Sequence, residues 1–593
     1  MVPALYRNMQ RFVRSVRQPL YHYMFACMTE QKMADTLLLE RTGVIKAGRG
    51  SWEELVRQRR SCVCHARAVV AGDPAPPPFP IGRWKIAANA ESARLEARPE
   101  LAELLRVTWE LRTPECSGYD LCDVEVVYED AVEWLRSPGR LSSPPVVIGI
   151  RTGGSYYAPF WALAAGQVWG TEIPYYTVRA LRTGDSIRYL DEEMALLPAD
   201  AGMRDIMMVD DQPDSGQTFV ALANRLMEKY GASSRIWAAS PGRLFRYGSR
   251  GIERVKDSVP LRKDIRNRLW QLLGDDDALM NRLRDVPGLE AHLRGSFVVV
   301  PRTQRLFWTH PSMRARSPYR INPKKTPFIV RRSVDERPLL FAKFIGKDLF
   351  GEYQYAMLKK FAHFLPDKHW FVDGYLITRF EPSLTNIREQ TAGLSRETAE
   401  TLARELIRFL ELIWETSAIE EPGMHVWMRR QYHVVAEEAF RRHGVGVGKL
   451  RQWLAEDDKG QGRATFVYSS LPYAYQHWHW AFVRSPGPPR MIRFHIDSTW
   501  GGITGVEVVA ASFLLETRPN LHFVQSFFRS VDTRQPSLVT SGEIVKALPA
   551  ALLLKMQDFL KNVQTWDDSI KTELSTSINY IQAIQKTVSV ESL

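Results

Sequence analysis

The chain has 593 residues, of which 45% are hydrophobic and 25% are charged, with a formal net charge of +12 and a pI near 9.3. This composition predicts a globular protein of about three or four domains, and its basic balance suits anionic ligands such as nucleotides or RNA without choosing among them. Five cysteines in so long a chain give no disulfide framework, which favours a reducing compartment such as the cytoplasm. Because no strongly apolar run of about 18 residues occurs, we expect no membrane span.

The first part of the chain, residues 1–95, predicts a helical N-terminal extension. Residues 1–70 carry apolar side chains at helical spacing, and the prolines between Asp73 and Pro80 indicate a linker. Two further helical stretches follow, near Glu91–Arg112 and Val124–Leu135.

Residues 144–240 alternate between short apolar runs and helical patterns. The expected strands are Pro145–Ile150, Ile173–Val178, Ile206–Val209 and Ser234–Ala239, and the expected helices between them are Tyr156–Val168 and Phe219–Tyr230. This alternation predicts an α/β domain over residues 96–245 with a doubly wound parallel sheet, whose ligands bind beyond the C-terminal ends of the strands.

The segment Ile206–Thr218 carries the most specific chemistry of the chain. An apolar strand ends in Asp210 and Asp211, and a short loop then opens a helix. Backbone N–H groups at a helix N-terminus suit a phosphate, because the helix dipole favours negative charge there. Two adjacent carboxylates suit ribose hydroxyls or a Mg²⁺ bound to them, since hard cations take oxygen ligands. The candidate phosphate-binding residues of the loop are Ser215, Gly216, Gln217 and Thr218.

A second loop of this kind follows the first expected strand of the sheet. It consists of Arg151, Thr152, Gly153 and Gly154 and is followed by a helix. Paired glycines let the backbone turn sharply and approach an anion closely, so this loop is a second candidate anion site.

Together these loops resemble those of type I phosphoribosyltransferases, which bind 5-phosphoribosyl-1-pyrophosphate (PRPP). Asp210, Asp211, Asp214, Ser215, Gly216 and Thr218 fit the family's PRPP motif. The resemblance implies a Mg²⁺-dependent transfer of the phosphoribosyl group to or from a small-molecule acceptor, and a homodimer.

The same resemblance assigns roles to individual side chains. Asp214 would act as a general acid or base, or would only shape the phosphate loop. The upstream glycine loop would bind pyrophosphate, and Arg179 and Arg182 lie in a segment that closes over PRPP in this family. These two arginines are candidates for stabilising the departing pyrophosphate, and the alternative is a solvated loop.

Residues 246–325 predict a charged connector, helical over residues 241–300. Residues 301–332 hold nine Lys or Arg and no acid, with Phe307, Trp308 and Tyr319 between them. This run either forms a basic face between domains or binds nucleic acid, and we favour the former.

Residues 326–540 resemble protein-kinase-like folds, in particular small-molecule kinases of the aminoglycoside phosphotransferase type. A strand near residues 339–346 carries Lys343, Glu352 opens a helix, and a strand ends near Pro382. The resemblance implies that Lys343 contacts ATP phosphates and that Glu352 holds Lys343.

The catalytic part of the kinase pattern is incomplete. Asp497 ends an expected strand and resembles the Mg²⁺-binding Asp of these kinases, but His479 then stands where a catalytic Asp is expected. A second alignment makes Asp497 itself the catalytic residue and leaves no metal-binding Asp after it. This domain is therefore either an active kinase or a degenerate nucleotide-binding or acceptor-binding module.

The last segment, residues 541–593, predicts one or two amphipathic helices. The whole sequence favours a phosphoribosyltransferase coupled to a kinase-like domain. Two alternatives stay open: a regulatory protein that senses PRPP or a nucleotide without turnover, and, less favoured, a nucleic-acid-binding protein.

Overall fold

The computed structural model describes residues 4–16, 18–45, 51–74, 76, 98–109, 114, 124–183, 186–211, 216–231, 235–239, 257–259, 275–293, 297–299, 328–335, 337–365, 368–380, 384–386, 394–417, 466–469, 480–483, 490–493, 502–517, 520–533, 539–562 and 568–591.

The chain divides into two compact units. The first consists of Met1–Ala291, Phe344–Gln354 and Val372–Tyr375, and the second consists of His292–Lys343, Tyr355–Phe371 and Leu376–Leu593. The N-terminal helices therefore belong to the same unit as the expected phosphoribosyltransferase-like sheet and do not form a separate extension.

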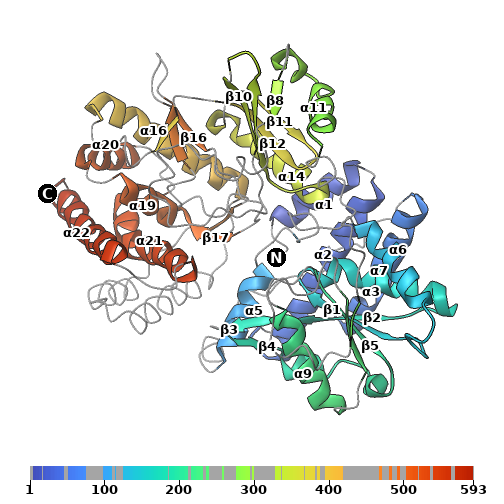
Figure 1. Ribbon diagram of the computed structural model, residues 1–593. Coiled ribbons are helices and arrows are strands. Elements are labelled where there is room, and N and C mark those ends of the chain that lie inside the picture. The colour runs from blue at the N-terminus through green and yellow to red at the C-terminus, as the bar shows by residue number, and fades with distance from the viewer. Residues whose placement is uncertain are drawn as a thin grey trace. The chain divides into compact units, whose positions relative to one another are not determined.

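The first unit contains a parallel sheet and its covering helices (Figure 1). The strands are β1 (Val146–Arg151), β2 (Tyr175–Arg179), β3 (Leu181–Thr183), β4 (Ser186–Arg188), β5 (Ile206–Val209), β6 (Ile236–Ala239) and β7 (Asp257–Val259). The helices are α1 (Ala4–Val16), α2 (Pro19–Arg41), α3 (Trp52–Ala71), α5 (Pro99–Trp109), α6 (Val124–Arg136), α7 (Gly154–Trp169), α8 (Asp191–Met194), α9 (Gln217–Tyr230) and α11 (Asp276–Arg284), with a 3₁₀ turn at Ala199–Met203.

The main sheet has the strand order β2-β1-β5-β6-β7, and each of its neighbouring pairs is parallel. All residues of β1 and β5 are buried, as expected for central strands of a parallel sheet with both faces covered. The α/β class and the parallel sheet are thus confirmed. Strand β7 corrects the expectation that residues 241–300 are wholly helical, although α11 lies in that range.

Helices cover both faces of the main sheet. Ile148 and Ile150 of β1 share one buried cluster with Phe219 and Leu222 of α9. On the other face a Cβ on Gly149 would lie 3.0 Å from the Cβ of Ala158 in α7, so only glycine lets this helix come so close. Figure 1 shows β1, β2 and β5 between α9 and the group α2, α3 and α7.

Helix α2 is the most deeply buried helix next to this sheet. Of its 23 residues 18 are buried, and they lie on all sides of the helix, which is the pattern of a helix surrounded by protein. It packs against α3, α5, α7 and β2. Helix α3 begins with a capping box, in which Ser51 and Glu54 each accept the other's backbone N–H.

A buried histidine pair joins α2 to α3. The rings of His22 and His65 are stacked with centroids 6.4 Å apart, and the Nδ1 of His65 lies 2.7 Å from the carbonyl oxygen of Ser61. Burial lowers the pKa of both rings, and the neighbouring His65 further lowers the pKa of His22. The folded protein therefore disfavours the protonated form of both rings.

We predict that acid destabilises the first unit through this pair. An unfolded histidine has a pKa of about 6.5, so below that pH the unfolded chain binds protons that the folded rings resist, and stability falls with the pH. The thermal unfolding midpoint of the parent should drop between pH 7.5 and 5.5, and the variant His22→Asn with His65→Gln should show a shallower drop. The exposed His522→Gln is the control; an equal slope in parent and double variant would refute the prediction.

A second sheet has the order β11-β12-β10-β9-β8. Its strands are β8 (Phe297–Val299), β9 (Phe328–Arg332), β10 (Pro338–Phe344), β11 (His369–Val372) and β12 (Tyr375–Arg379), with α14 (Asp348–Leu358) and a 3₁₀ turn (Lys359–Phe364) between β10 and β11. The pairs β8–β9 and β9–β10 are antiparallel. The expected order of strand, helix and strand around Lys343 and Glu352 is confirmed, although the helix begins earlier than predicted.

The described elements from Leu384 onward belong to the second unit and are helices and short strands. The helices are α16 (Arg396–Ser417), α19 (Val506–Glu516), α20 (Leu521–Asp532), α21 (Ser541–Asn562) and α22 (Asp568–Glu591), and the strands are β13 (Leu384–Asn386), β14 (Phe466–Ser469), β15 (Trp480–Val483), β16 (Arg490–Arg493) and β17 (Gly502–Gly505). Helix α16 packs against α20, and α19 packs against α21. The two C-terminal helices confirm the expectation for residues 541–593. None of the helices in the described part of the chain combines the length and apolar character needed to cross a bilayer.

Candidate functional site

The two candidate anion loops meet at one edge of the main sheet. They follow β1 and β5, which are adjacent parallel strands, so both loops leave the sheet at its C-terminal edge. The chain leaves β1 towards β2 and leaves β5 towards β6, which lies on the opposite side, so the connections of these two neighbouring strands diverge. Such a switch point between strands is where open α/β sheets bind ligands.

Asp210 joins the two loops. Its Oδ1 accepts the backbone N–H of Gly154 at 3.0 Å and that of Asp211 at 3.0 Å. The residue is only 8% exposed, and the two N–H groups stabilise its carboxylate in that position. Asp210 therefore fixes the register between the glycine loop and the end of β5.

Only glycine fits at positions 153 and 154 of the first loop, because a larger side chain would clash with the end of β5. A Cβ on Gly153 would lie 2.3 Å from Oδ2 of Asp211, and a Cβ on Gly154 would lie 2.1 Å from the carbonyl oxygen of Val209. Real side chains do not approach so closely, so residues larger than glycine would push the loop away from β5. The peptide bond that enters this loop, Arg151–Thr152, is cis.

Two long helices begin at this edge, and both have glycine at the N-cap. Gly153 precedes α7 and Gly216 precedes α9, and neither helix receives a hydrogen bond from its N-cap side chain. Gly216 has a φ of 69°, a left-handed conformation that favours glycine. In α7 the first N–H, that of Gly154, is accepted by the carboxylate of Asp210, which shows that this helix end attracts negative charge. The positive end of the α9 dipole suits a negatively charged ligand in the same way.

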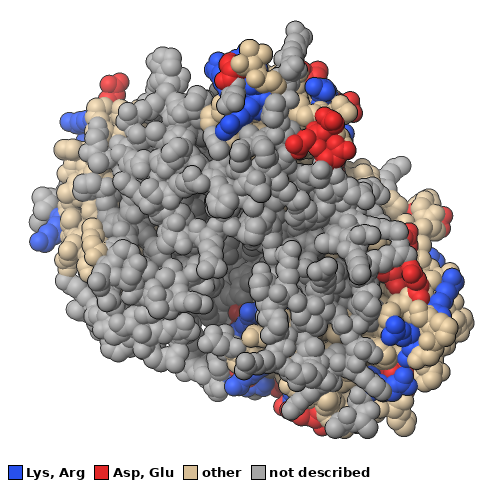
Figure 2. Space-filling model, viewed as in Figure 1, with Lys and Arg blue, Asp and Glu red and all other residues tan. Residues whose placement is uncertain are grey.

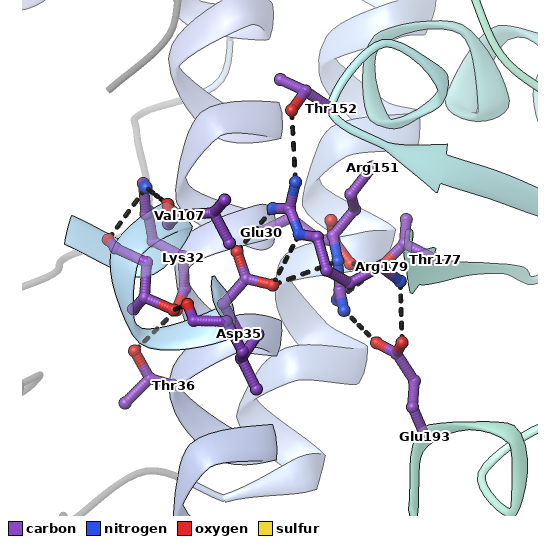
Figure 3. A network of polar contacts seen from close by, with 12 residues as sticks. Glu30, Lys32, Asp35, Thr36, Val107, Arg151, Thr152, Thr177, Arg179 and Glu193 are labelled. Carbon is purple, nitrogen blue, oxygen red and sulfur yellow. Dashed lines mark hydrogen bonds and ion pairs between the residues drawn. The ribbon is translucent and has the colours of Figure 1, made fainter. Parts of the chain in front are cut away.

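A buried network of ion pairs lies at the ends of β1 and β2 (Figure 3). Arg179 donates from Nε and Nη2 to the two carboxylate oxygens of Asp35 at 3.0 and 2.5 Å. Arg151 lies 3.3 Å from Asp35 through its Nε and also pairs with Glu193, which accepts the backbone N–H of Arg179 at 2.7 Å. Thr177 connects this group to Glu30 at 2.8 Å.

The charges of this network balance in number. Its acids are Glu30, Asp35 and Glu193, and its arginines are Arg59, Arg151 and Arg179. Burial alone would raise the pKa of Asp35, but Arg179 and Arg151 outweigh it and hold that pKa below its usual value. Burial raises the pKa of Glu193, and the neighbouring Arg151 only partly opposes this rise.

The predicted arginines therefore differ in their placement. Arg151 and Arg179 are each 4% exposed, and they pair with acids from α2 and α8. A contact with pyrophosphate requires a guanidinium that faces solvent, so these two side chains are not placed as predicted. One contact of Arg179 does reach the loop, because its Nη1 donates to Oγ1 of Thr152 at 3.2 Å. Arg182 is exposed on β3, which forms an antiparallel hairpin with β4 where a polar loop was expected.

The other residues of the predicted site lie partly within the described chain. Gln217 is exposed and Thr218 half-buried in the first turn of α9, and the carbonyl oxygen of Thr218 accepts the hydroxyl of Tyr189 at 3.0 Å. Asp214 and Ser215 lie outside the described residues, as do His479 and Asp497 of the kinase-like pattern.

The carboxylates at the end of β5 fit a magnesium ion that is shared with a substrate. Asp210 is oriented by two N–H groups and Asp211 lies half-buried beside it, and both supply the hard oxygen ligands that Mg²⁺ takes. Among the described residues there is no cluster of three or more metal-ligating side chains, so any ion here would take its remaining ligands from substrate and water. Magnesium is commonly bound in this way, through one or two carboxylates and the phosphates of a substrate.

The residues predicted for the kinase-like site lie on the expected elements. Lys343 is buried, 6% exposed, near the end of β10. Glu352 lies in α14 and hydrogen-bonds with the hydroxyl of Tyr21 in α2; burial and this bond raise the pKa of Tyr21. In the same unit the ring of Phe350 lies 6.1 Å from that of Tyr156, and the ring of Tyr353 lies 5.7 Å from that of Phe12.

Sequence reasoning missed the acids that surround Arg151 and Arg179. Glu30 and Asp35 stand in a helix that is otherwise almost wholly buried, and Glu193 follows two other acids in α8. A signal was present, because a lone carboxylate within the apolar run Met33–Leu39 needs a buried partner. Nothing in the sequence says that the partners lie more than a hundred residues away.

The described surface does not separate the two kinds of charge. On the face in Figure 2, the described Lys and Arg side chains lie beside Asp and Glu side chains. Arg98 pairs with Glu192 at 2.5 Å, and Arg225 pairs with Asp191 and Glu228. The basic run over residues 301–327 lies outside the described residues.

Comparisons with known proteins identify no family for this chain. No family model and no curated protein matches the sequence. Among solved structures, choline kinase LicA from Streptococcus pneumoniae aligns at 12% identity over 43% of this chain and 89% of that chain, with a TM-score of 0.28. A choline/ethanolamine kinase family protein from Mesorhizobium loti aligns at 14% identity over 52% and 94%, also at 0.28.

A macrolide 2′-phosphotransferase type I aligns at 12% identity over 42% of this chain and 87% of that chain, again with a TM-score of 0.28. Scores this low carry no argument about the fold of this chain. A function for the second sheet can therefore be argued only from its own strand order and residues.

Proposed function

We propose that the first unit is a Mg²⁺-dependent phosphoribosyltransferase that transfers the 5-phosphoribosyl group between PRPP and an acceptor. The observation that carries this proposal is the bond from the Gly154 N–H to the Asp210 carboxylate. It brings the glycine loop and the acidic end of β5 together at the switch point of a parallel sheet. Two helices with glycine N-caps begin beside this bond, so one small region combines two anion sites with a carboxylate pair.

In this proposal each part of the edge holds one part of PRPP. The 5-phosphate binds at the N-terminus of α9, and the pyrophosphate binds at the glycine loop before α7. Asp210 and Asp211 hold the ribose hydroxyls, directly or through the ion. When bound, Mg²⁺ would offset negative charge on the pyrophosphate oxygens.

The reaction is a displacement at the anomeric carbon of the ribose. The bond from this carbon to the pyrophosphate oxygen breaks with its electron pair, a lone pair of the acceptor forms the new bond, and the acceptor loses a proton. Because Asp210 accepts the N–H of Gly154, the N–H of Gly153 and the positive end of the α7 dipole stabilise the charge that develops on pyrophosphate. Asp214 takes the proton from the acceptor or shapes the phosphate loop, and the exposed Arg182 on the β3–β4 hairpin contacts the departing group.

Calorimetry and isotope turnover test this proposal together. We expect the full chain to bind PRPP in the presence of Mg²⁺ and to release labelled pyrophosphate when the correct acceptor is supplied from a panel of bases, amides and aromatic acids. Failure to bind PRPP in Mg²⁺ would reject the site itself. Binding without pyrophosphate release from any acceptor would instead favour the alternative of a PRPP-sensing regulatory protein.

A second candidate function concerns the sheet β8–β12. The chain forms three antiparallel strands (β8, β9 and β10), then helix α14, and then the hairpin β11–β12, whose second strand lies beside β10. This includes the order of strand, helix and strand that is expected around Lys343. This order supports the proposal that Lys343 binds ATP, in an active kinase or in a degenerate nucleotide-binding module.

We predict that millimolar Mg²⁺-ATP protects Lys343 from acylation, because bound phosphates would cover its ammonium group. Peptide mass spectrometry after treatment with an acylating reagent measures the modified fraction. Lys359 is exposed and serves as the internal control, since its modification should not change. Equal labelling of Lys343 with and without ATP would remove the main support for nucleotide binding.

A further inference from the structure

Helix α2 reaches the connection between β1 and α7 through three of its side chains. The hydroxyl of Tyr23 donates to the carbonyl oxygen of Tyr156 in the first turn of α7 at 2.5 Å. Glu30 accepts from Thr177 of β2, and Asp35 pairs with both Arg151 and Arg179. The helix that was expected to be an appendage therefore contacts both strands that end beside the glycine loop.

Arg179 connects α2 to the loop, because it binds both Asp35 and Thr152. Two nitrogens of its guanidinium, Nε and Nη2, bind the two oxygens of Asp35, and the third, Nη1, donates to Oγ1 of Thr152 at 3.2 Å (Figure 3). A guanidinium is planar and rigid, so fixing two of its nitrogens also fixes the direction of the third. Thr152 is only half-buried and begins the loop.

Stability alone gives a weak reason for so many buried charges. Removing two charges from water costs several kcal/mol, and apolar residues of similar volume are often at least as stable as a buried ion pair. What a network of buried ion pairs does provide is a preferred geometry for its members, because an arrangement that separates a pair leaves a buried charge without its partner. The last contact of this network is the hydrogen bond from Arg179 to the hydroxyl of Thr152.

We propose that Asp35 is a positioning residue for the candidate anion loop: through Arg179 it holds Thr152, and with it the N–H group of Gly153, in the orientation that binds pyrophosphate. Asp35 touches no reacting atom, and its effect on the ligand is indirect. The role in pyrophosphate binding depends on the proposed function, whereas the role in ordering the loop does not.

Hydrogen exchange in the ligand-free full chain tests the ordering of the loop. We expect peptides that cover Thr152–Ser155 to exchange about tenfold faster in Asp35→Asn and in Thr152→Val, because each change removes the charge-assisted contact with Arg179. The double variant should exchange no faster than the faster single variant, since both changes break one connection. The start of α9 should exchange as in the parent, which a general loss of stability would not allow.

Thr177→Val is the matched control. It removes a hydroxyl of the same size from the same network, where Thr177 contacts Glu30, Arg59 and Arg151 but neither Thr152 nor the two loop glycines. We expect a lower melting temperature without faster exchange at the loop. If Asp35→Asn does not fold, Arg179→Lys replaces it, since a lysine keeps one charge beside Asp35 but lacks the fork that reaches Thr152.

Pyrophosphate affinity in Mg²⁺ then separates the two proposals. We expect about tenfold weaker binding of inorganic pyrophosphate in Asp35→Asn and Thr152→Val, and no greater loss in the double variant. Unchanged loop exchange in Asp35→Asn, or effects that multiply in the double variant, would overturn the positioning role. If the exchange responds as expected but the parent binds neither pyrophosphate nor PRPP, the positioning role stands and the proposed reaction fails.

Discussion

We expect replacement of Asp210 and Asp211 by asparagine to weaken the proposed binding of PRPP in Mg²⁺ by about a hundredfold or more. The carboxylate of Asp210 accepts two backbone N–H groups, and Asp211 lies against Gly153, so both charges face the same small region. A hydrogen bond to a charged group contributes about 1.5–3 kcal/mol, and each 1.4 kcal/mol is tenfold in affinity, so two lost charges account for this decrease. Titration calorimetry with and without Mg²⁺ measures the change.

Asp205→Asn is the control for this double variant. Asp205 is also buried, but it lies just before β5, at the other end of the strand, where it accepts the indole N–H of Trp237 at 2.9 Å and pairs with Arg235. We expect this change to lower the melting temperature and to leave PRPP affinity unchanged. If the double variant binds PRPP as tightly as the parent, the assignment of the carboxylate pair is wrong.

Alanine at the two loop glycines separates binding from folding. In Gly153→Ala the new methyl group meets the carboxylate of Asp211, a side chain that can move, so we expect PRPP affinity to fall while the chain still folds. In Gly154→Ala the methyl group meets the backbone oxygen of Val209, which cannot move without breaking the contact of the loop with β5. Overpacking of this kind costs about 1–3 kcal/mol or more, so this variant should lose stability as well as binding.

Calorimetry and thermal unfolding of both variants check this difference, and Gly542→Ala provides a comparison. A Cβ at Gly542 would have no neighbour closer than 4.0 Å, so alanine there should leave stability unchanged or slightly raised. A Gly154→Ala protein with the melting temperature and affinity of the parent would show that the loop does not lie against β5 as described.

The sequence could predict those parts of the site that are built from neighbouring residues. An apolar run that ends in acids and continues into a glycine loop specifies both a strand and its exit, and β5 has the predicted bounds. The same local logic placed α9 within two residues of its observed start and put Lys343 on a strand. In each case hydrophobic periodicity and turn residues carry the information.

The rest of the site depends on contacts that no local pattern encodes. Arg151 and Arg179 were predicted to face a ligand because arginines near a phosphate loop commonly do so. Their actual partners come from α2 and α8, and only the folded chain brings Asp35 and Glu193 to them. Likewise β7 is a three-residue strand in a stretch of charged residues, and its pairing with β6 rather than its composition makes it a strand.

The distance along the chain between Asp35 and Arg179 also has a consequence for biosynthesis. The two residues are 144 positions apart, and α2 has apolar side chains on all its faces. At about 5–20 residues per second, the ribosome needs roughly 7–30 seconds to make Arg179 after Asp35. Until Arg151 and Arg179 are made, Asp35 has no ionic partner and α2 lacks the sheet that buries it. The nascent chain therefore exposes an apolar helix that chaperones are expected to bind.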